Sequence, residues 1–422
     1  MNRRFDFDRI SLLIYALLVI GGWMTIYAVT SIGGAEEIFS LKYPHGKQLM
    51  WIGISLVAGF IVLSMDHRLI EGVAYVAYGI GVALIFLALI IGKEVNGAKS
   101  WIMIAGQQFQ PSEFAKISTA LALAKYMSSL NFSLSNTRHL IGALAIIFVP
   151  ALIVVLQNDT GSALVFASLL IVFYREGLNP ILPAIAIVLG TVIILSLGIK
   201  NRWIVWGILF GATAISFLYF RTKRNQVRLG LIHLGAFLLL VGVSFSAQYL
   251  VSKLQPHQKI RIEVLFNPEI DPQGAGYNVT QSKIAIGSGG FAGKGFLQGS
   301  YTKYKFVPKQ ETDFIFCTVG EEYGWLGSAG LVALFFALIW RLRFLAEYAK
   351  TRFARIYGYG IISILFFHVM VNIGMTLGLV PVIGIPLPFF SYGGSSLLAF
   401  TLMIFLLLNL FSFRSSVLGM KT

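Results

Sequence analysis

The stretch HQKIRIEVLFNPEIDPQGAGYNVTQSKIAIGSGGFAGKGF (257–296) opens the longest polar segment of an otherwise apolar chain. The segment continues to about Glu322 and is unusually rich in acidic residues. Chemistry that needs charge is therefore expected here, because the rest of the chain is mostly apolar. The acids of the segment are Glu263, Glu269, Asp271, Glu311, Asp313, Glu321 and Glu322.

The composition around this segment is that of a membrane protein. The chain has 422 residues, of which 57% are hydrophobic and 12% are charged, and its mean hydropathy is +0.78. A soluble domain has roughly 25% charged residues. The net charge of +15 would suggest nucleic-acid binding in a soluble protein, but the basic residues stand in short runs between apolar segments, which indicates membrane topology and contact with anionic lipids. Cys317 is the only cysteine, so no intrachain disulfide can form.

Apolar runs near twenty residues in length predict an all-α polytopic membrane protein with about 12 transmembrane helices in a single integral membrane domain, 1–422. The first run follows Arg3 and Arg4, and no small-residue cleavage site follows it, so we expect an anchor rather than a removed signal peptide. The runs at 111–127 and 161–175 are short. The predicted spans are 10–30, 48–65, 72–91, 111–127, 139–156, 161–175, 181–199, 203–220, 230–251, 313–340, 357–380 and 394–412.

The basic residues predict the orientation of these spans, because cytoplasmic loops carry an excess of Lys and Arg. With the N-terminus inside, most basic residues outside the long loop are cytoplasmic, and both termini are predicted to be cytoplasmic. Residues 251–312 then form a large extracytoplasmic loop. The residues assigned to the inner side are Arg3, Arg4, Arg9, Arg68, Arg138, Arg175, Arg221, Lys223, Arg224, Arg228, Arg341, Arg343, Lys350, Arg352, Arg355, Arg414 and Lys421, and those assigned to short outer loops are Lys42, Lys47, Lys93, Lys99, Lys200 and Arg202.

The 251–312 loop mixes apolar residues with Gly and Pro, so we expect it to be structured. The string KIAIGSGGFAGKGFLQG (283–299) predicts a short amphipathic helix followed by tight glycine turns. Glycine-rich turns can present backbone N–H groups to phosphates. No Ser or Thr follows Lys294 at the spacing of a Walker A motif, which favours simple turns.

Asp271 begins the sequence Asp-Pro-Gln-Gly, which predicts a turn. Its carboxylate could cap that turn, or it could act as a base at the membrane surface. A base must be held rigidly, face its substrate and stay free of a tight ion pair, and Glu269 could raise the pKa of Asp271 by like-charge repulsion. Spacing alone does not decide which of Glu263, Glu269 and Asp271 faces a substrate.

Basic residues flank this turn at Lys259, Arg261 and Lys283. Positive side chains beside a candidate base suit an anionic substrate such as a phosphate or pyrophosphate. The alternative is a solvated loop face or contact with lipid headgroups.

Glu113 and Lys116, in QPSEFAKI, stand three residues apart on one face of a helix opened by Pro111. Ionisable residues at membrane depth are costly, and they usually line a cavity or pair with each other. We favour a cavity-lining role in which Lys116 reaches an anionic head group; the alternative is a mutual salt bridge.

Further acids divide into two kinds. Asp159 and Asp313 precede apolar runs, where an N-cap is the alternative to a functional role. Glu321 and Glu322 lie about two turns into a predicted helix, so capping does not explain them, and at least one should face polar surroundings.

The stretch VNIGMTLGLVPVIGIPLPFFSYGGSS (371–396) interrupts the membrane pattern with several Pro and Gly residues. Irregular backbone at membrane depth is tolerated only where protein or a cavity buries it. We therefore predict a re-entrant or loop segment at the outer face, with a kinked hairpin as the alternative. The six histidines are dispersed, so no zinc site is expected.

Together, NGAKSWI…QPSEFAKI, Q-x-D-T-G-S-A, FNPEIDPQGAGYNVTQSKIAIGSGG, TDFIF…GEE and GIPLPFFSYGGSS stand in the order found in the SEDS family (shape, elongation, division and sporulation), and the chain resembles that family over nearly its whole length. VNIGM and GIPLPF are more similar to the elongation branch, RodA, than to the division branch, FtsW. The family core has ten helices, so the resemblance implies an inserted pair within 181–251. Asn158 and the pair Gln310-Glu311 depart from the family pattern.

The resemblance implies a peptidoglycan glycosyltransferase of the bacterial inner membrane that polymerises lipid II during cell elongation and shape maintenance. It also implies a class B penicillin-binding protein as transpeptidase partner, other rod-complex membrane proteins, and a divalent cation, Mg²⁺ or Mn²⁺, whose ligands the sequence does not show. The essential outer-loop aspartate of the family matches Asp271. Other matching positions are Lys116, Glu113, Asp159, Arg261, Lys283, Asp313 and Ser391.

The implied reaction is an inverting displacement of polyprenyl pyrophosphate that forms a β-1,4 linkage, with Asp271 as the general base for the acceptor hydroxyl. Inversion favours a single displacement without a covalent sugar–enzyme intermediate. Two other classes stay open: a transporter that flips lipid II, which charged residues within the bilayer permit, and a non-enzymatic membrane scaffold.

Overall fold

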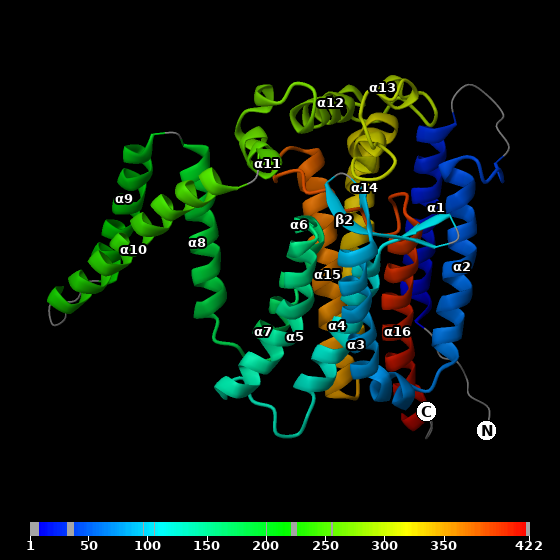
Figure 1. Cartoon of the computed structure of the whole chain (residues 1–422), viewed down its shortest axis with the longest axis horizontal. Helices are drawn as coiled ribbons and strands as arrows, with labels where there is room; N and C mark the ends of the chain where they lie inside the picture. Colours follow the sequence, from blue (N-terminus) through cyan, green and yellow to red (C-terminus); the bar gives the residue numbers. More distant parts are fainter. Residues whose placement is uncertain are drawn as a thin grey trace. The chain divides into compact units, whose positions relative to one another are not determined.

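The computed structural model describes residues 8–31, 38–95, 97–104, 106–199, 201–220, 226–254 and 256–418 (Figure 1). Contacts divide the chain into two compact units, one made of Met1–Gly177 with Asn278–Thr422 and the other of Leu178–Tyr277. Each unit is described by itself, and the single domain stays a prediction. Of the basic residues used for topology, Arg3, Arg4, Lys200, Arg221, Lys223, Arg224 and Lys421 lie outside the described residues.

The first unit is helical apart from one small sheet. Its helices are α1 (Arg9–Thr30), α2 (Pro44–Ser64), α3 (His67–Ile91), α4 (Pro111–Met127), α5 (Thr137–Leu156), α6 (Thr160–Ala167), α7 (Leu170–Arg175), α13 (Ser300–Lys303), α14 (Ile315–Glu347), α15 (Arg352–Thr376) and α16 (Gly394–Leu418). The sheet, which the sequence analysis did not predict, has the antiparallel order β1 (Lys93–Val95), β2 (Ala98–Ile104) and β3 (Gln107–Phe109).

The second unit contains α8 (Ile181–Gly198), α9 (Arg202–Phe220), α10 (Gln226–Lys253), α11 (Pro256–Phe266) and the short 3-10 helix η1 (Pro268–Ile270). The boundary between the units falls within α12 (Ala275–Ser288). Helix α10 packs against both α8 and α9. Ser196 on α8 donates to Ser244 on α10 at 2.8 Å, which joins the two helices through polar groups.

Ten helices in the described part of the chain are long and apolar enough to cross a membrane, which confirms the helical membrane fold. The count of about 12 is not confirmed. The predicted span 161–175 is divided into α6 and α7, and the predicted span 111–127 coincides with α4, which has only 17 residues. Ionisable side chains lower the hydropathy of α4.

Helix α4 is the central element of the first unit. Fourteen of its 17 residues are buried, and α3, α5, α15 and α16 pack around it. A helix that is buried on all sides can keep polar side chains away from lipid if neighbouring helices supply partners. Elsewhere in the unit α16 packs along α2, and α14 packs along α15 (Figure 1).

Helix α14 is interrupted at Gly324, whose φ of +65° and ψ of −157° are not helical. The loop 289–299 meets this interruption. The N–H groups of Trp325 and Leu326 donate to the carbonyl oxygens of Gly290 and Phe291 at 2.9 and 3.1 Å. The loop therefore satisfies backbone donors that the interruption removes from the helix.

Candidate functional site

The Asp271 turn lies in the second unit, between η1 and α12. Its carboxylate accepts a hydrogen bond at Oδ2 from the N–H of Ala275 at 2.7 Å, and its carbonyl oxygen accepts from the N–H of Tyr277 at 3.1 Å. Asp271 therefore caps the start of α12. The sequence analysis gave this capping as the alternative to a role as base. Capping also fixes the carboxylate on a rigid turn, because the side chain and the main chain of Asp271 are both tied to α12.

The other acids of this segment are bound differently. Glu269 is exposed, and its N–H donates to Oδ1 of Asn267 at 3.2 Å. Glu263 lies 3.6 Å from the Nζ of Lys259 in a partly exposed i,i+4 pair. Among the described residues only Asp271 combines a carboxylate with a helix-capping turn in this segment, which distinguishes it from its two neighbours.

Arg261 is half-buried on α11, in the same unit as Asp271. Among the described residues no ion pair within 4.0 Å involves its guanidinium. The five donors of that group therefore stay available for an anion.

A buried cluster in the first unit contains Glu113, Lys116 and a residue that the sequence analysis missed, His368. The Nζ of Lys116 lies 2.8 Å from Oε1 of Glu113 and 3.0 Å from Nε2 of His368, and the ring of Phe400 lies 5.4 Å away. Lys116 is 1% exposed. The mutual salt bridge that the sequence left open is thus present, while contact of Lys116 with an anionic head group stays a prediction.

His368 is oriented by the 377–393 loop. Its Nδ1 lies 3.1 Å from the carbonyl oxygen of Pro386, which can only accept. Nδ1 therefore carries the proton in this contact, and Nε2 is left as an acceptor for an N–H of Lys116. A lone histidine in an apolar run gives no sequence signal for this role, since its partner is 252 residues away.

The 377–393 loop is fixed by buried polar side chains. Asn372 donates to the carbonyl oxygens of Asp313 and Ile385 at 2.9 and 2.8 Å. Ser391 donates to the carbonyl oxygen of Thr312 at 2.5 Å and accepts from the N–H of Leu387 at 2.9 Å. Ile385 and residues 387–391 are buried by protein, as irregular backbone within a membrane requires. The contacts of Asn372 and Ser391 tie Thr312 and Asp313 to this loop.

Asp159 caps α6, which the sequence analysis gave as the alternative to a functional role. Its Oδ1 accepts from the N–H of Ser162 at 3.0 Å, and its Oδ2 accepts from the hydroxyl of Ser162 at 2.8 Å. Oδ2 also accepts from Nε2 of Gln110 at 3.1 Å. The carboxylate therefore connects the start of α6 to the residue that precedes α4. Asp313 does not cap α14, because Phe314 is the N-cap of that helix.

Lys283 is exposed on α12 in the first unit and lies beside Gly378. On the same helix Ser282 donates to the carbonyl oxygen of Thr376 at 2.9 Å. These contacts place one side of α12 against the end of α15 and leave the ammonium of Lys283 accessible.

Glu321 and Glu322 are buried inside α14 and face the loop 289–299 and α13. Glu321 accepts from Nζ of Lys294 at 2.7 Å, from the N–H of Tyr301 at 2.9 Å and from the N–H of Thr302 at 2.8 Å. The expectation that at least one of these acids faces polar surroundings is confirmed.

The glycine-rich loop makes these contacts with its own backbone. The N–H groups of Lys294 and Gly295 donate to the carbonyl oxygens of Glu321 and Glu322, and the N–H of Leu297 donates to Oε1 of Glu322. Gly290, Gly293 and Gly295 have positive φ. The turn interpretation is therefore correct, because these N–H groups bind α14 rather than a phosphate.

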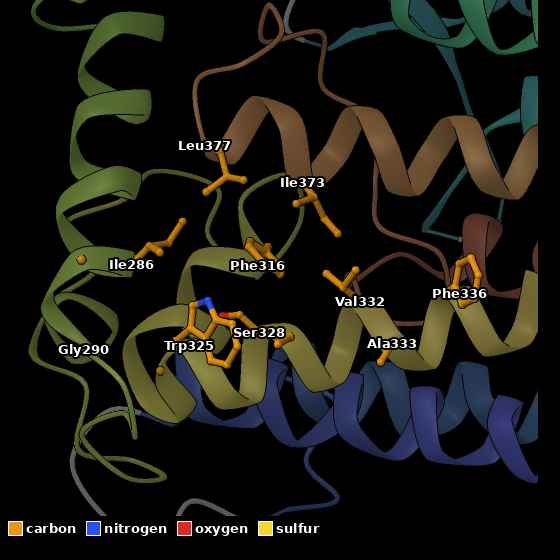
Figure 2. Close-up of a pocket in the computed structure, with 13 residues that line it drawn as sticks. Ile286, Gly290, Phe316, Trp325, Ser328, Val332, Ala333, Phe336, Ile373 and Leu377 are labelled. Carbon is orange, nitrogen blue, oxygen red and sulfur yellow. The ribbon is translucent and has the colours of Figure 1, made fainter.

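A cavity of about 650 Å³ lies beside the interruption of α14. Figure 2 shows Ile286 from α12, Trp325 and Val332 from α14, Ile373 from α15 and Leu377 from the C-cap of α15 around it. No charged side chain lines this cavity, so it can take apolar groups but offers no positive charge to a pyrophosphate.

The described residues contain no group of three or more His, Cys, Asp or Glu side chains that could hold a metal ion. Mg²⁺ is commonly held by one or two carboxylates together with substrate phosphates. The exposed carboxylate of Glu269 is suited to be one such carboxylate ligand.

Comparisons with known proteins place this arrangement in a family. The sequence model of the cell cycle proteins FtsW, RodA and SpoVE matches residues 8–209 and 184–416. These two matches overlap over residues 184–209, in α8 and the first part of α9, within the region where an inserted pair of helices was expected.

Individual relatives agree with that match. The chain is 34% identical to the peptidoglycan glycosyltransferase MrdB of Escherichia coli K12, with 92% of this chain and 87% of the relative covered. It is 32% identical to the peptidoglycan glycosyltransferase RodA of Treponema pallidum, with 93% and 94% covered.

Two solved structures have the same fold. One belongs to a study of a peptidoglycan synthase complex, with a TM-score of 0.70 at 26% identity and coverage of 97% of this chain and 98% of the other. The second is the rod shape determining protein RodA of Thermus thermophilus, with a TM-score of 0.59 at 25% identity and coverage of 98% and 99%. The chain therefore belongs to the FtsW/RodA/SpoVE family of cell cycle proteins.

Proposed function

We propose that this chain is a peptidoglycan glycosyltransferase that polymerises lipid II into β-1,4-linked glycan strands during cell elongation. The membership of the family and the names of the relatives support the enzyme class. The single observation that carries the mechanism is the capped turn that holds Asp271.

In this mechanism Asp271 is the general base that accepts the proton of the acceptor sugar hydroxyl. Among the described residues, Oδ2 makes the hydrogen bond to the N–H of Ala275, which leaves Oδ1 for the substrate. A carboxylate held by its own turn needs no rearrangement to face a hydroxyl, and positioned acid–base catalysis contributes about 10²–10⁴-fold to rate.

The leaving group is polyprenyl pyrophosphate, which needs no strong acid. Arg261 is the proposed donor to its phosphate oxygens, because guanidinium groups bind phosphate with two parallel N–H bonds. Lys116 and Lys283 stay proposed contacts of the anionic head group, on the resemblance alone. A divalent cation would neutralise charge on the diphosphate, with Glu269 as a carboxylate that could share in holding it.

The proposed setting is the bacterial inner membrane, with both termini cytoplasmic and the 251–312 loop on the periplasmic side. One solved neighbour comes from a complex that coordinates polymerization and crosslinking. We propose on that basis a class B penicillin-binding protein as the crosslinking partner.

The test uses purified full-length protein with lipid II and Mn²⁺ and measures glycan chains on gels. Asp271→Asn should reduce polymerisation by about 10²–10⁴-fold. Its amide oxygen can still accept from Ala275, so the capped turn should persist. Asp66→Asn is the matched control, because Asp66 also caps a helix with its carboxylate, at the start of α3, and it should retain most activity.

Polymerisation by folded Asp271→Asn at the wild-type rate would refute the base. Movement of lipid II across liposomes without glycan chains would favour the transporter alternative, and the absence of both activities with a partner present would favour a scaffold.

A further inference from the structure

The second unit contains a cavity of about 620 Å³ that belongs to no part of the proposed reaction. Leu197 and Gly198 line it from α8, Val251 and Ser252 line it from α10, and α11 with η1 closes it. Helices α8 and α10 are long and apolar enough to span a membrane, and the 11-residue α11 is not. The cavity therefore lies where two candidate spans end, which is the depth at which lipid headgroups would stand.

The wall between α8 and α11 is tightly packed. A Cβ atom added to Gly198 would approach the ring of Phe266 to 2.6 Å, so glycine is required for this close approach. Gln248 on α10 donates to the carbonyl oxygen of Ser196 at 3.0 Å and holds the opposite wall. The cavity thus has fixed walls from three helices, and its volume is in the range of small-molecule sites.

The lining combines apolar surface with one charge of each sign. Ile262, Phe266 and Ile270 supply apolar surface, while Lys259 and Glu263 supply the charges. Their N···O distance of 3.6 Å is longer than a charge-assisted hydrogen bond, and their side chains are 45% and 38% exposed. Such partly exposed pairs contribute little to stability, so a ligand can separate the charges at small cost.

We propose that this cavity binds a zwitterionic phospholipid headgroup that carries a primary ammonium, as in phosphatidylethanolamine. Lys259 would donate to the phosphate, and Glu263 would accept from the ammonium. The acyl chains would continue along α8 and α10, where Ile194 and Leu250 are exposed apolar side chains. An anionic headgroup without an ammonium would leave Glu263 facing negative charge.

The ligand would contact the segment that carries Asp271. Asn267 and Ile270 both line the cavity. Asn267 accepts from the N–H of Glu269 at the start of η1, and Ile270 directly precedes Asp271. A bound headgroup would therefore stabilise the turn of the proposed base, a consequence that rests on the proposed function, whereas the binding site itself does not.

The experiment measures lipid retention by native mass spectrometry of the purified full-length protein, independently of polymerisation. Probes are phosphatidylethanolamine, phosphatidylcholine and phosphatidylglycerol with identical chains. We expect phosphatidylethanolamine to be retained best, because a trimethylated ammonium has no N–H donors for Glu263. Glycerophosphoethanolamine, which has no chains, should compete weakly, which distinguishes a lipid from a free headgroup.

Lys259→Met and Glu263→Gln should each weaken phosphatidylethanolamine retention by about tenfold, since each removes a hydrogen bond to a charged group. Lys303→Met, an exposed lysine on α13, is the matched control and should retain lipid as wild type does. Equal retention by all three variants, or equal retention of the three lipids, would overturn the site. Retention of phosphatidylethanolamine by wild-type protein that polymerises no lipid II would instead count against the proposed function.

Discussion

Lys116 shows how much a single buried charge depends on its partners. Its ammonium is held by Glu113 at 2.8 Å and by His368 at 3.0 Å, with almost no access to solvent. Removal of one partner from a buried pair costs about 3–5 kcal/mol, while replacement of both by neutral groups is often tolerated. The cluster therefore fixes α4 against α15 without adding much net stability.

Lys116→Met should reduce the free energy of unfolding in detergent by about 3–5 kcal/mol, because Glu113 is left buried without its cation. The double variant Lys116→Met, Glu113→Gln should recover at least half of that loss. Equal destabilisation of the single and double variants would contradict the uncompensated charge as the cause.

At the same scale, the sequence predicted local contacts better than distant ones. It selected Glu113, Lys116 and Asp271, and it allowed the caps made by Asp159 and Asp271 as alternatives. It could not predict His368 or Asn372, because their partners are far away in the chain and each looks like an ordinary residue in an apolar run. The packing of α4 against α15 brings His368 to Lys116, and the fold of the 377–393 loop brings Asn372 to Asp313 and Ile385.

Helix boundaries and breaks depend on both local and distant contacts. The apolar runs predicted the spanning helices well. They did not predict the interruption of α14, since the sequence TVGEEYGWLG (318–327) differs little from that of an uninterrupted helix. The break requires Gly324 with positive φ and the loop 289–299 beside it. The small sheet at 93–109 was missed because two of its three strands have only three residues each.

Gly324→Ala should destabilise the protein by about 1–3 kcal/mol, because a side chain at positive φ is strained and its Cβ would lie 2.3 Å from the N atom of Gly293. Gly330→Ala on the same helix is the matched control, since nothing lies within 4 Å of its added Cβ. Thermal unfolding of both variants measures the difference. A Gly324→Ala variant as stable as Gly330→Ala would contradict the strained break.

Asp8 connects the start of α1 to Arg341 on α14. It accepts from the N–H of Ser11 at 2.9 Å and is bound by the guanidinium of Arg341. Partial burial alone would raise the pKa of Asp8, but hydrogen bonds from Arg341 and Ser11 outweigh it and hold the pKa below the ordinary value of 3.8. The charge therefore stabilises the fold above pH 3.8, and this contribution is lost as the pH falls further.

Asp8→Asn keeps the cap and removes the charge, so the variant should be less stable than wild type at pH 5. The difference should shrink as the pH falls below 3.8. Thermal unfolding of both proteins from pH 5 to below pH 3.8 measures this difference in stability. Asp66→Asn at the exposed N-cap of α3 is the control, and a constant wild-type-to-variant difference for Asp8→Asn would exclude the linkage.

The predicted helical membrane fold is confirmed, with ten candidate spans among the described residues and family relatives along nearly the full length of the chain. An even-numbered helical insertion leaves the orientation of everything after it unchanged. The side of the membrane on which each loop lies stays a prediction from the basic residues.

That orientation can be tested because Cys317 is the only cysteine. In a Cys317→Ser background, Ser300→Cys should react with a membrane-impermeant thiol reagent applied to cells whose outer layers admit it. Lys350→Cys, also at an exposed position, should react only after the membrane is opened. The reverse pattern would invert the predicted topology.

The interruption of α14 also has a consequence for biosynthesis. The carbonyl groups of Gly290 and Phe291, which bind the N–H groups of Trp325 and Leu326, leave the ribosome before those donors do. The acceptors are thus already synthesised when α14 emerges. The N–H groups that the interruption frees therefore have acceptors in the chain from the moment they leave the ribosome.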